Sequence, residues 1–331
     1  MPAVPRPYVC PPDNTAIQHD GTEHLAINNT FFRRSWLLFK YNAVRLLRIA
    51  RYDGGCLLLS ERLVVKTGPE VHLTEGATMK FVAEKTSIPV PGVYCSFIHK
   101  NQAYIIMERL PGRGIPKVWK TLSEAHLDKI CEQLRTMLAE LRALQPPPGT
   151  GVQSCVGGSL RDFRIPHCRP RMGPFKTVQE FHIWLRDGLQ VDADPASDTT
   201  EDDVEVRKMA TLQDGPWPPP VFTHGDLNAS NILIDDENVI TGIIDWETAG
   251  WYPTTGSILP SGTGTESGRD GRASFRGFYS RIPRNWRWKS LAKSGGEISR
   301  SRLHRASTKC IEKVSLYEIK AHKQLILTVS R

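Results

Sequence analysis

The sequence predicts an α+β protein with two lobes, a small lobe centred on an antiparallel sheet and a larger, mainly helical lobe. Short apolar runs separated by turn residues fill the first third of the chain, and a long helical pattern begins after residue 120. The composition changes abruptly after residue 253, which marks a further boundary. We therefore divide the chain into a small lobe at 1–108, a larger lobe at 109–253 and a tail at 254–331.

The first predicted helix lies at residues 31–50, which are rich in aromatic residues and leucine. Five Lys or Arg residues in this segment exclude a simple membrane span. The pattern indicates an amphipathic helix on the small lobe, and a helix lying in a membrane interface stays open as an alternative. The Pro-rich N-terminus lacks the apolar core of a signal sequence, and the seven cysteines form no paired motif. We expect reduced thiols and a cytoplasmic protein.

The small-lobe sheet should begin with an apolar hairpin at 57–66 that ends in Lys66, a point charge suited to nucleotide phosphates. Residues 51–55 (Arg-Tyr-Asp-Gly-Gly) could form a glycine-rich phosphate lid or an ordinary hairpin turn. Apolar positions at helical spacing predict a helix over 73–85. Glu75 lies in its first turn, where it could pair with Lys66.

A strand is expected at 103–108, and Pro111-Gly112 interrupts the regular structure after it. The larger lobe follows. A leucine-rich stripe predicts a helix over 122–144 with Ser123 as its N-cap, and a second helix is expected over 175–189. Seven acidic residues between 191 and 205 indicate a solvated loop, or alternatively a rim that attracts the amine of a substrate.

The most informative segment is residues 224–231, which read His-Gly-Asp-Leu-Asn-Ala-Ser-Asn. Asp226 and Asn231 are five positions apart, and Asp245 follows the apolar run at 239–244. Phosphoryl transfer needs one carboxylate to orient a hydroxyl, with an amide oxygen and a second carboxylate to hold Mg²⁺. The spacing favours that chemistry over a polar turn whose acids merely cap backbone amides.

Together, the Lys66/Glu75 pair, the strand and break at 105–112, the loop at 223–233 and the stretch at 243–253 resemble the aminoglycoside phosphotransferase-like family, in the type abundant in filamentous fungi. The resemblance implies a protein-kinase-like fold and phosphorylation of a small-molecule hydroxyl by ATP and Mg²⁺. It also implies roles for single residues. These are catalysis at Asp226 with His224 bracing the loop, Mg²⁺ binding at Asn231 and Asp245, phosphate binding at Lys66 held by Glu75, and adenine binding by the backbone of Glu108 and Leu110.

The chain departs from the family after Pro253, where members continue into further helices. Residues 254–331 contain 16 Lys or Arg against 5 Asp or Glu, a net charge of +11, whereas 1–253 has −3. Such a segment is predicted to be largely disordered. The departure from the family indicates either a truncated or frame-altered gene product or a divergent tail. Two rival functions follow: an inactive nucleotide-binding protein, and binding of nucleic acid or acidic membrane by the tail. The sequence names neither the acceptor nor an oligomeric state.

Overall fold

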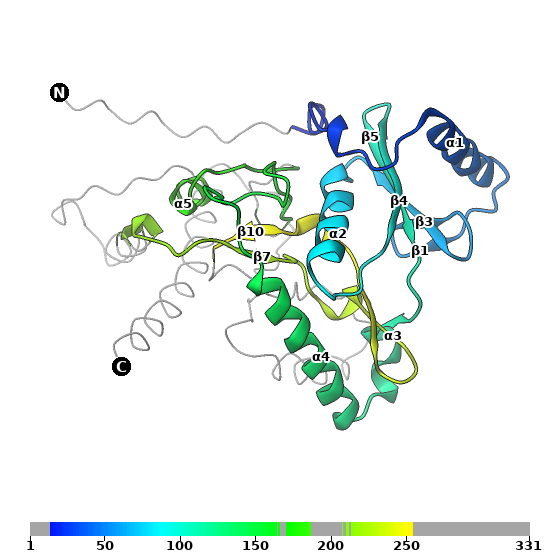
Figure 1. The fold of residues 1–331 in the computed structure, drawn as a ribbon. Coiled ribbons are helices and arrows are strands. Elements are labelled where there is room, and N and C mark those ends of the chain that lie inside the picture. The colour runs from blue at the N-terminus through cyan, green and yellow to red at the C-terminus, as the bar shows by residue number, and fades with distance from the viewer. Residues whose placement is uncertain are drawn as a thin grey trace, which may run out of the picture.

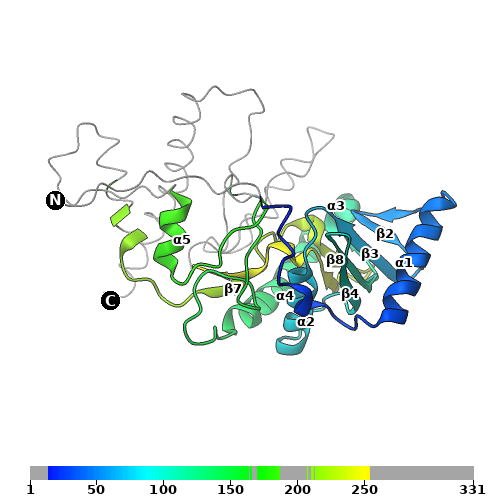
Figure 2. The ribbon, with the colours of Figure 1, turned by 90° about the horizontal axis from the view of Figure 1, so that it is seen from above.

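The structure is a computed structural model that describes residues 14–163, 165, 170–186, 207, 210, 211 and 213–253. The prediction for the tail at 254–331 and that for the acidic loop at 191–205 lie outside the described residues. The described chain has the predicted α+β architecture with two lobes (Figures 1 and 2).

A five-stranded antiparallel sheet forms the small lobe, in the order β1-β2-β3-β5-β4. Its strands are β1 (Tyr52–Asp53), β2 (Cys56–Leu58), β3 (Leu63–Gly68), β4 (Val93–His99) and β5 (Gln102–Glu108). The β1–β2 turn contains Gly54 at φ +59°, so residues 51–55 form the hairpin turn that was one of the two interpretations. Whether this turn also covers phosphates stays a prediction.

Helices cover both faces of this sheet, as Figure 2 shows. α1 (Phe31–Leu46) packs on one face, and α2 (Leu73–Lys85) packs on the other. Alternation along β5 explains the two layers, since successive side chains point to opposite faces of a strand. Tyr104 and Ile106 join the cluster under α1, while Ile105 and Met107 join the cluster under α2.

The larger lobe is built on α4 (Glu124–Ala143), a 20-residue helix. Ser123 caps it as predicted, because its hydroxyl accepts a hydrogen bond from the His126 amide at 3.3 Å. The other elements are α3 (Ile115–Val118), α5 (Val178–Leu185), a sheet of β6 (Arg113–Gly114), β8 (Ile232–Ile234) and β9 (Ile240–Ile243), and a pair of β7 (Val221–Thr223) and β10 (Gly250–Tyr252). Short 3₁₀ turns lie at Glu23–Leu25, Trp119–Thr121, Ala229–Asn231 and Trp246–Thr248.

The helix predicted over 175–189 begins later than expected. Phe175 forms a β-bridge with Val152, and the Thr177 side chain accepts the Glu180 amide at 3.1 Å as an N-cap. The helix therefore starts at Val178, and residues beyond Arg186 on this segment are not described.

One hydrophobic core runs through both lobes. Small-lobe residues of α2 and β5 share a cluster with α4, β8 and β9, and the buried Trp246 and Trp251 belong to it as well. Because this core crosses from one lobe to the other, the loop between β7 and β8 is packed directly against the small lobe. No helix in the described part of the chain is long and apolar enough to cross a membrane.

Candidate active site

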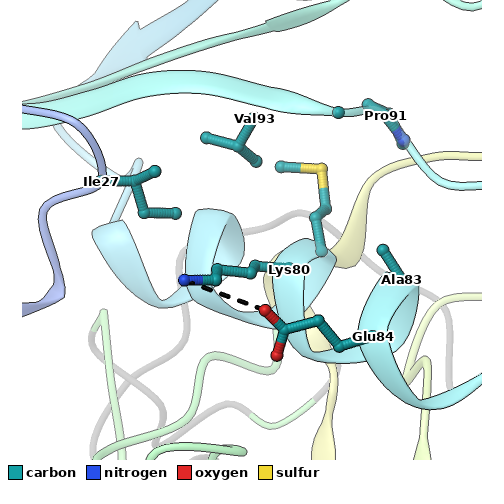
Figure 3. A pocket seen from close by; sticks show the side chains of 8 residues that line it. Ile27, Lys80, Ala83, Glu84, Pro91 and Val93 are labelled. Atoms are coloured by element: carbon teal, nitrogen blue, oxygen red, sulfur yellow. Dashed lines mark ion pairs between the residues drawn. The ribbon is translucent and has the colours of Figure 1, made fainter.

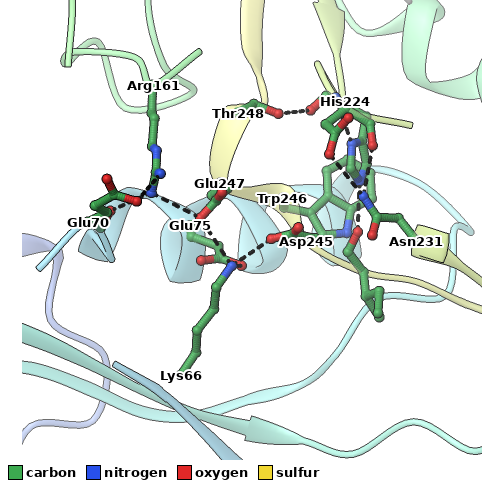
Figure 4. Close-up of polar contacts among 12 residues, drawn as sticks. Lys66, Glu70, Glu75, Arg161, His224, Asn231, Asp245, Trp246, Glu247 and Thr248 are labelled. Atoms are coloured by element: carbon green, nitrogen blue, oxygen red, sulfur yellow. Dashed lines mark hydrogen bonds and ion pairs between the residues drawn. The ribbon is translucent and has the colours of Figure 1, made fainter. Parts of the chain in front are cut away.

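The site forms where β3 and α2 of the small lobe meet two loops of the larger lobe, one between β7 and β8 and the other after β9 (Figure 4). β3 presents Lys66, and the first turn of α2 presents Glu75. The β7–β8 loop carries His224, Asp226 and Asn231, and Asp245 follows β9. The structure thus brings together the residues that the sequence singled out from four separate segments.

The expected pair between Lys66 and Glu75 is present, with Nζ and Oε1 2.9 Å apart. The Lys66 ammonium also contacts Asp245 Oδ1 at 2.6 Å and Glu247 Oε2 at 3.3 Å. Burial alone would lower the pKa of Lys66, but these three carboxylates raise it well above its usual value. Lys66 therefore keeps its positive charge among these carboxylates.

The pKa values of two carboxylates that contact Lys66, Glu75 and Asp245, are shifted in opposite directions. Burial raises the pKa of Glu75 to about 7, although Lys66 pulls in the opposite direction. Its Oε2 is buried and has no hydrogen-bond partner among the described residues. For Asp245, burial is outweighed by the ammonium of Lys66, and the pKa lies below its usual value. Asp245 is also the more open of the two, with 35% of its side chain exposed against 2% for Glu75.

Asp226 is buried and held by amides from its own loop. Its Oδ2 accepts hydrogen bonds from Asn228 Nδ2 at 3.2 Å and from Asn231 Nδ2 at 3.3 Å. Asn231 Nδ2 also donates to the Asp226 carbonyl at 2.9 Å, so the amide oxygen of Asn231 points away from Asp226. No hydrogen bond to this oxygen is found among the described residues, which leaves it available as a metal ligand.

His224 braces the loop through both ring nitrogens. Its Nδ1 accepts the Asp226 amide at 3.3 Å, and its Nε2 lies 3.0 Å from the Ile244 carbonyl. Because a carbonyl can only accept a hydrogen bond, Nε2 is the nitrogen that donates to Ile244. The ring also packs on Trp246, with centroids 4.4 Å apart. His224 thereby ties the Asp226 loop to the end of β9, one residue before Asp245.

The two loops also contact each other at Gly225, and Asp245 has a left-handed backbone conformation. Gly225 has φ +80°, and a Cβ there would lie 2.5 Å from the Thr248 carbonyl oxygen. Thr248 Oγ1 donates to the His224 carbonyl at 3.0 Å across the same contact. Asp245 itself has φ +67° and ψ +59°, a conformation that is uncommon for residues other than glycine. Such a backbone outlier at a polar cluster favours a functional role for this turn.

Two charged residues of this site, Glu247 and Arg161, were not identified from the sequence. Glu247 lies two positions after Asp245, and its carboxylate joins Lys66 to Arg161 Nη1 at 3.4 Å. Arg161 in turn binds both the carboxylate and the carbonyl of Glu70, just before α2. Glu247 was within reach of the motif argument, because it belongs to the Asp-Trp-Glu run. Arg161 follows no local pattern, since only the fold brings it here.

The predicted adenine-binding segment follows β5. The amides of Glu108 and Arg109 are occupied, donating to Gly92 at 2.8 Å and to Arg62 at 2.9 Å. For the Leu110 amide, no hydrogen bond is found among the described residues. The Leu110 side chain lies against β9, where a Cβ on Gly242 would come within 2.4 Å of it. This contact fixes the segment beside the strand that leads to Asp245.

A separate pocket of about 200 Å³ lies between α2 and the chain that leads into β4 (Figure 3). Its lining includes Ile27, Met79 and Val93, and an ion pair between Lys80 and Glu84 spans 3.9 Å at its rim. It shares no residue with the cluster around Lys66 and Asp226, so we assign no substrate to it.

The model of the phosphotransferase enzyme family matches residues 60–255, which is more than half of the chain. The chain belongs to the phosphotransferase enzyme family. All of the site residues described above lie within the matched segment, and so do Arg161 and Glu247.

Relatives of this family member include a curated protein, "Clavilactone A biosynthesis cluster protein Y" of Ampulloclitocybe clavipes, which is 28% identical over 205 residues. That alignment covers 51% of this chain and 47% of the relative, so the match spans about half the length of the curated protein. Solved structures that resemble the chain include an aminoglycoside-3'-phosphotransferase of type VIII (20% identity, TM-score 0.39, 81% of this chain and 97% of that one). Another is an aminoglycoside phosphotransferase of Streptomyces rimosus in complex with ADP and streptomycin (15%, TM-score 0.41, 81% and 96%).

Proposed function

We propose that this phosphotransferase transfers the γ-phosphoryl group of ATP to a hydroxyl of a small molecule, with Mg²⁺. The observation that carries the proposal is the position of Asp226, whose carboxylate is fixed by two amide groups in a loop tied to Asp245. Within this proposal the small lobe comprises residues 1–108 and the catalytic lobe residues 109–253.

Asp226 has the surroundings that a positioning base needs. Hydrogen bonds from Asn228 and Asn231 hold Oδ2, and the carboxylate would accept a hydrogen bond from the attacking hydroxyl. The same two contacts fix the direction of the carboxylate, so the hydroxyl is oriented rather than merely bound. Catalysis of this kind depends mainly on position, and the proton moves to Asp226 as the new bond forms.

The oxygen donors present fit Mg²⁺. Asn231 Oδ1 and the Asp245 carboxylate are hard ligands of the type that Mg²⁺ prefers, and magnesium sites commonly use only one or two protein groups besides phosphates and water. No group of three or more His, Cys, Asp or Glu side chains suited to a metal lies within the described residues. When bound, the ion would neutralise charge on the phosphoryl oxygens.

Lys66 is the residue we assign to the nucleotide phosphates. It extends from β3 and is held by the buried Glu75, so its ammonium has a fixed position. Contact with Asp245 would give way to phosphate, because Asp245 is needed by the metal. At the other end of the nucleotide, the Glu108 carbonyl and the Leu110 amide would bind the adenine edge.

The acceptor is proposed only as a class. Structures similar to this chain have been solved with streptomycin and gentamicin, and others belong to a macrolide 2'-phosphotransferase and a choline kinase. The small molecules named for these proteins all carry a hydroxyl group. We therefore propose an acceptor of that kind, without a narrower assignment.

Titration calorimetry with ATP, in the presence and absence of Mg²⁺, tests the nucleotide part of the proposal. We expect tighter binding with the metal, and Lys66→Met should weaken it. Equal or absent binding in a folded sample would reject the proposal. Turnover is then measured on a panel of hydroxyl-bearing metabolites. Binding without turnover of any acceptor would favour the alternative of an inactive nucleotide-binding protein.

A further inference from the structure

Helix α1 has two apolar faces, and the part of the chain that the structure describes packs on one of them. Leu37 is buried against the small-lobe sheet, with Tyr41 and Val44 packed beside it. On the opposite side, Phe32, Trp36, Phe39 and Leu46 recur at intervals of four, three and seven residues, which places them along one stripe. These four residues are 83%, 51%, 72% and 84% exposed, respectively.

Further exposed apolar residues lie at the start of the helix and after its end. Phe31, Leu47, Ile49 and Tyr52 are also more than half exposed. With these, eight of the thirteen large apolar residues that are exposed in the described chain fall between residues 31 and 52. Scattered apolar residues are normal on a protein surface, but a contiguous patch of this kind marks an interaction site.

The segment that carries this patch is rich in basic residues and contains no acidic ones. Residues 31–52 contain six Lys or Arg and no Asp or Glu, a net charge of +6. None of the six forms an ion pair with a residue that the structure describes. Lys40 lies over the ring of Trp36, 5.0 Å from its centroid, and Arg33 lies 4.9 Å from that of Tyr94. Long basic chains that extend over apolar surface keep their charges available to a partner.

The charge decides between occupants. A second copy of α1 would bring one cluster of six positive charges against another, so pairing of two copies on this face is disfavoured. A lipid surface that carries negative headgroups satisfies both features, because the apolar stripe enters the interface while the bases bind phosphates. Trp and Phe side chains are suited to that position, since aromatic residues are common at membrane interfaces.

We propose that α1 and the turn after it dock the small lobe onto a bilayer that contains anionic phospholipid. Phe32, Trp36, Phe39 and Leu46 enter the headgroup region, and α1 lies parallel to the surface. α1 covers the face of the sheet opposite to α2 and Lys66 (Figures 1 and 2). The phosphotransferase site therefore stays open to water while the protein is bound.

Flotation of the full chain with phospholipid vesicles tests the proposal. We expect binding to phosphatidylcholine vesicles that contain about one-third phosphatidylserine to exceed binding to pure phosphatidylcholine by about tenfold or more, and to weaken with added salt. The triple variant Phe32→Ser/Phe39→Ser/Leu46→Ser should lose about tenfold in binding. Its matched control is Ile17→Ser/Val156→Ser/Val239→Ser, which removes three exposed apolar residues elsewhere and should bind as the wild type does.

A second pair of variants tests the charge. Arg34→Gln/Lys40→Gln/Arg48→Gln should lose binding to the anionic vesicles, whereas Lys85→Gln/Lys120→Gln/Lys176→Gln removes the same charge elsewhere and should lose less. The basic residues 254–331 are present in every variant, so they contribute a common background. Thermal unfolding checks that each variant is folded. The single substitutions Phe32→Ser and Leu46→Ser, at the two most exposed positions, replace the triple variant if it unfolds.

Three results would overturn the proposal. The first is equal flotation with and without phosphatidylserine. The second is binding that the α1 variants and their controls share, which would place the lipid contact elsewhere. The third is a concentration-dependent dimer in sedimentation velocity that dissociates in the Phe32/Phe39/Leu46 variant without any lipid binding, which would make a second copy the occupant.

Discussion

Replacing Gly225 with Ala should destabilise the loop between β7 and β8 more than the addition of one methyl group suggests. Gly225 adopts φ +80°, which costs an L-residue about 1 kcal/mol or more. In addition, the new Cβ would lie 2.5 Å from Thr248 O and 2.7 Å from Thr248 Oγ1. A collision with fixed backbone typically costs about 1–3 kcal/mol, so we expect a total loss of about 2–4 kcal/mol in the free energy of unfolding.

Gly54→Ala separates the two contributions. Gly54 has φ +59°, but a Cβ there would meet nothing within 4 Å, so it should lose only the conformational part, about 1 kcal/mol. Urea unfolding of both variants gives the difference directly. If Gly225→Ala is as stable as Gly54→Ala, the close approach of Thr248 does not constrain this loop and the reasoning is wrong. The same collision predicts that a bulkier residue would not fit between His224 and Asp226.

Three further predictions concern the charged groups of the site. Asp226→Asn should lower turnover by about 10²–10⁴ with little change in ATP affinity, and an unchanged rate would remove Asp226 from its role. In the wild type, the pKa of Glu75 is about 7 in the folded state against 4.5 for the free side chain, so the folded state holds the extra proton. The free energy of unfolding should therefore fall by about 3 kcal/mol as the pH rises from 4.5 to 7, and Glu75→Gln should remove this dependence, as urea titrations at several pH values would show. Arg161→Gln should cost about 2 kcal/mol because it leaves Glu247 with one partner fewer, whereas Arg113→Gln, in an exposed pair with Asp236, should cost less than about 1 kcal/mol in the same assay.

Local pattern was enough to predict several elements. The helix at Leu73–Lys85 and the cap at Ser123 follow from spacing and residue type, because such signals act within one turn of helix. The Lys66–Glu75 pair could be predicted for a similar reason, since a strand and the next helix are adjacent in space. What these cases share is that the partners are close in sequence or joined by a short connection.

Contacts between distant segments could not be predicted in this way. Arg161 meets Glu247 only because the loop after Val152 pairs with β10 through a bridge from Gln153 to Trp251. Phe175 was expected in a helix because it is apolar at the right spacing, yet its bridge to Val152 delays the helix start. The second face of α1 was visible as composition, but its exposure depends on which face the sheet takes.

If this site binds ATP as we propose, its charges predict a requirement for metal. Lys66 is surrounded by three carboxylates, and Arg161 neutralises only part of the charge on Glu247. A nucleoside triphosphate without metal would add further negative charge to this cluster. Like charges that are close together and partly buried repel strongly. Two routes relieve the repulsion: protonation of Glu75, whose pKa of about 7 makes this accessible, and a divalent cation at Asp245. Because the second route acts at every pH at which Asp245 is ionised, ATP binding should depend on Mg²⁺ most strongly above pH 7, where Glu75 has lost its proton.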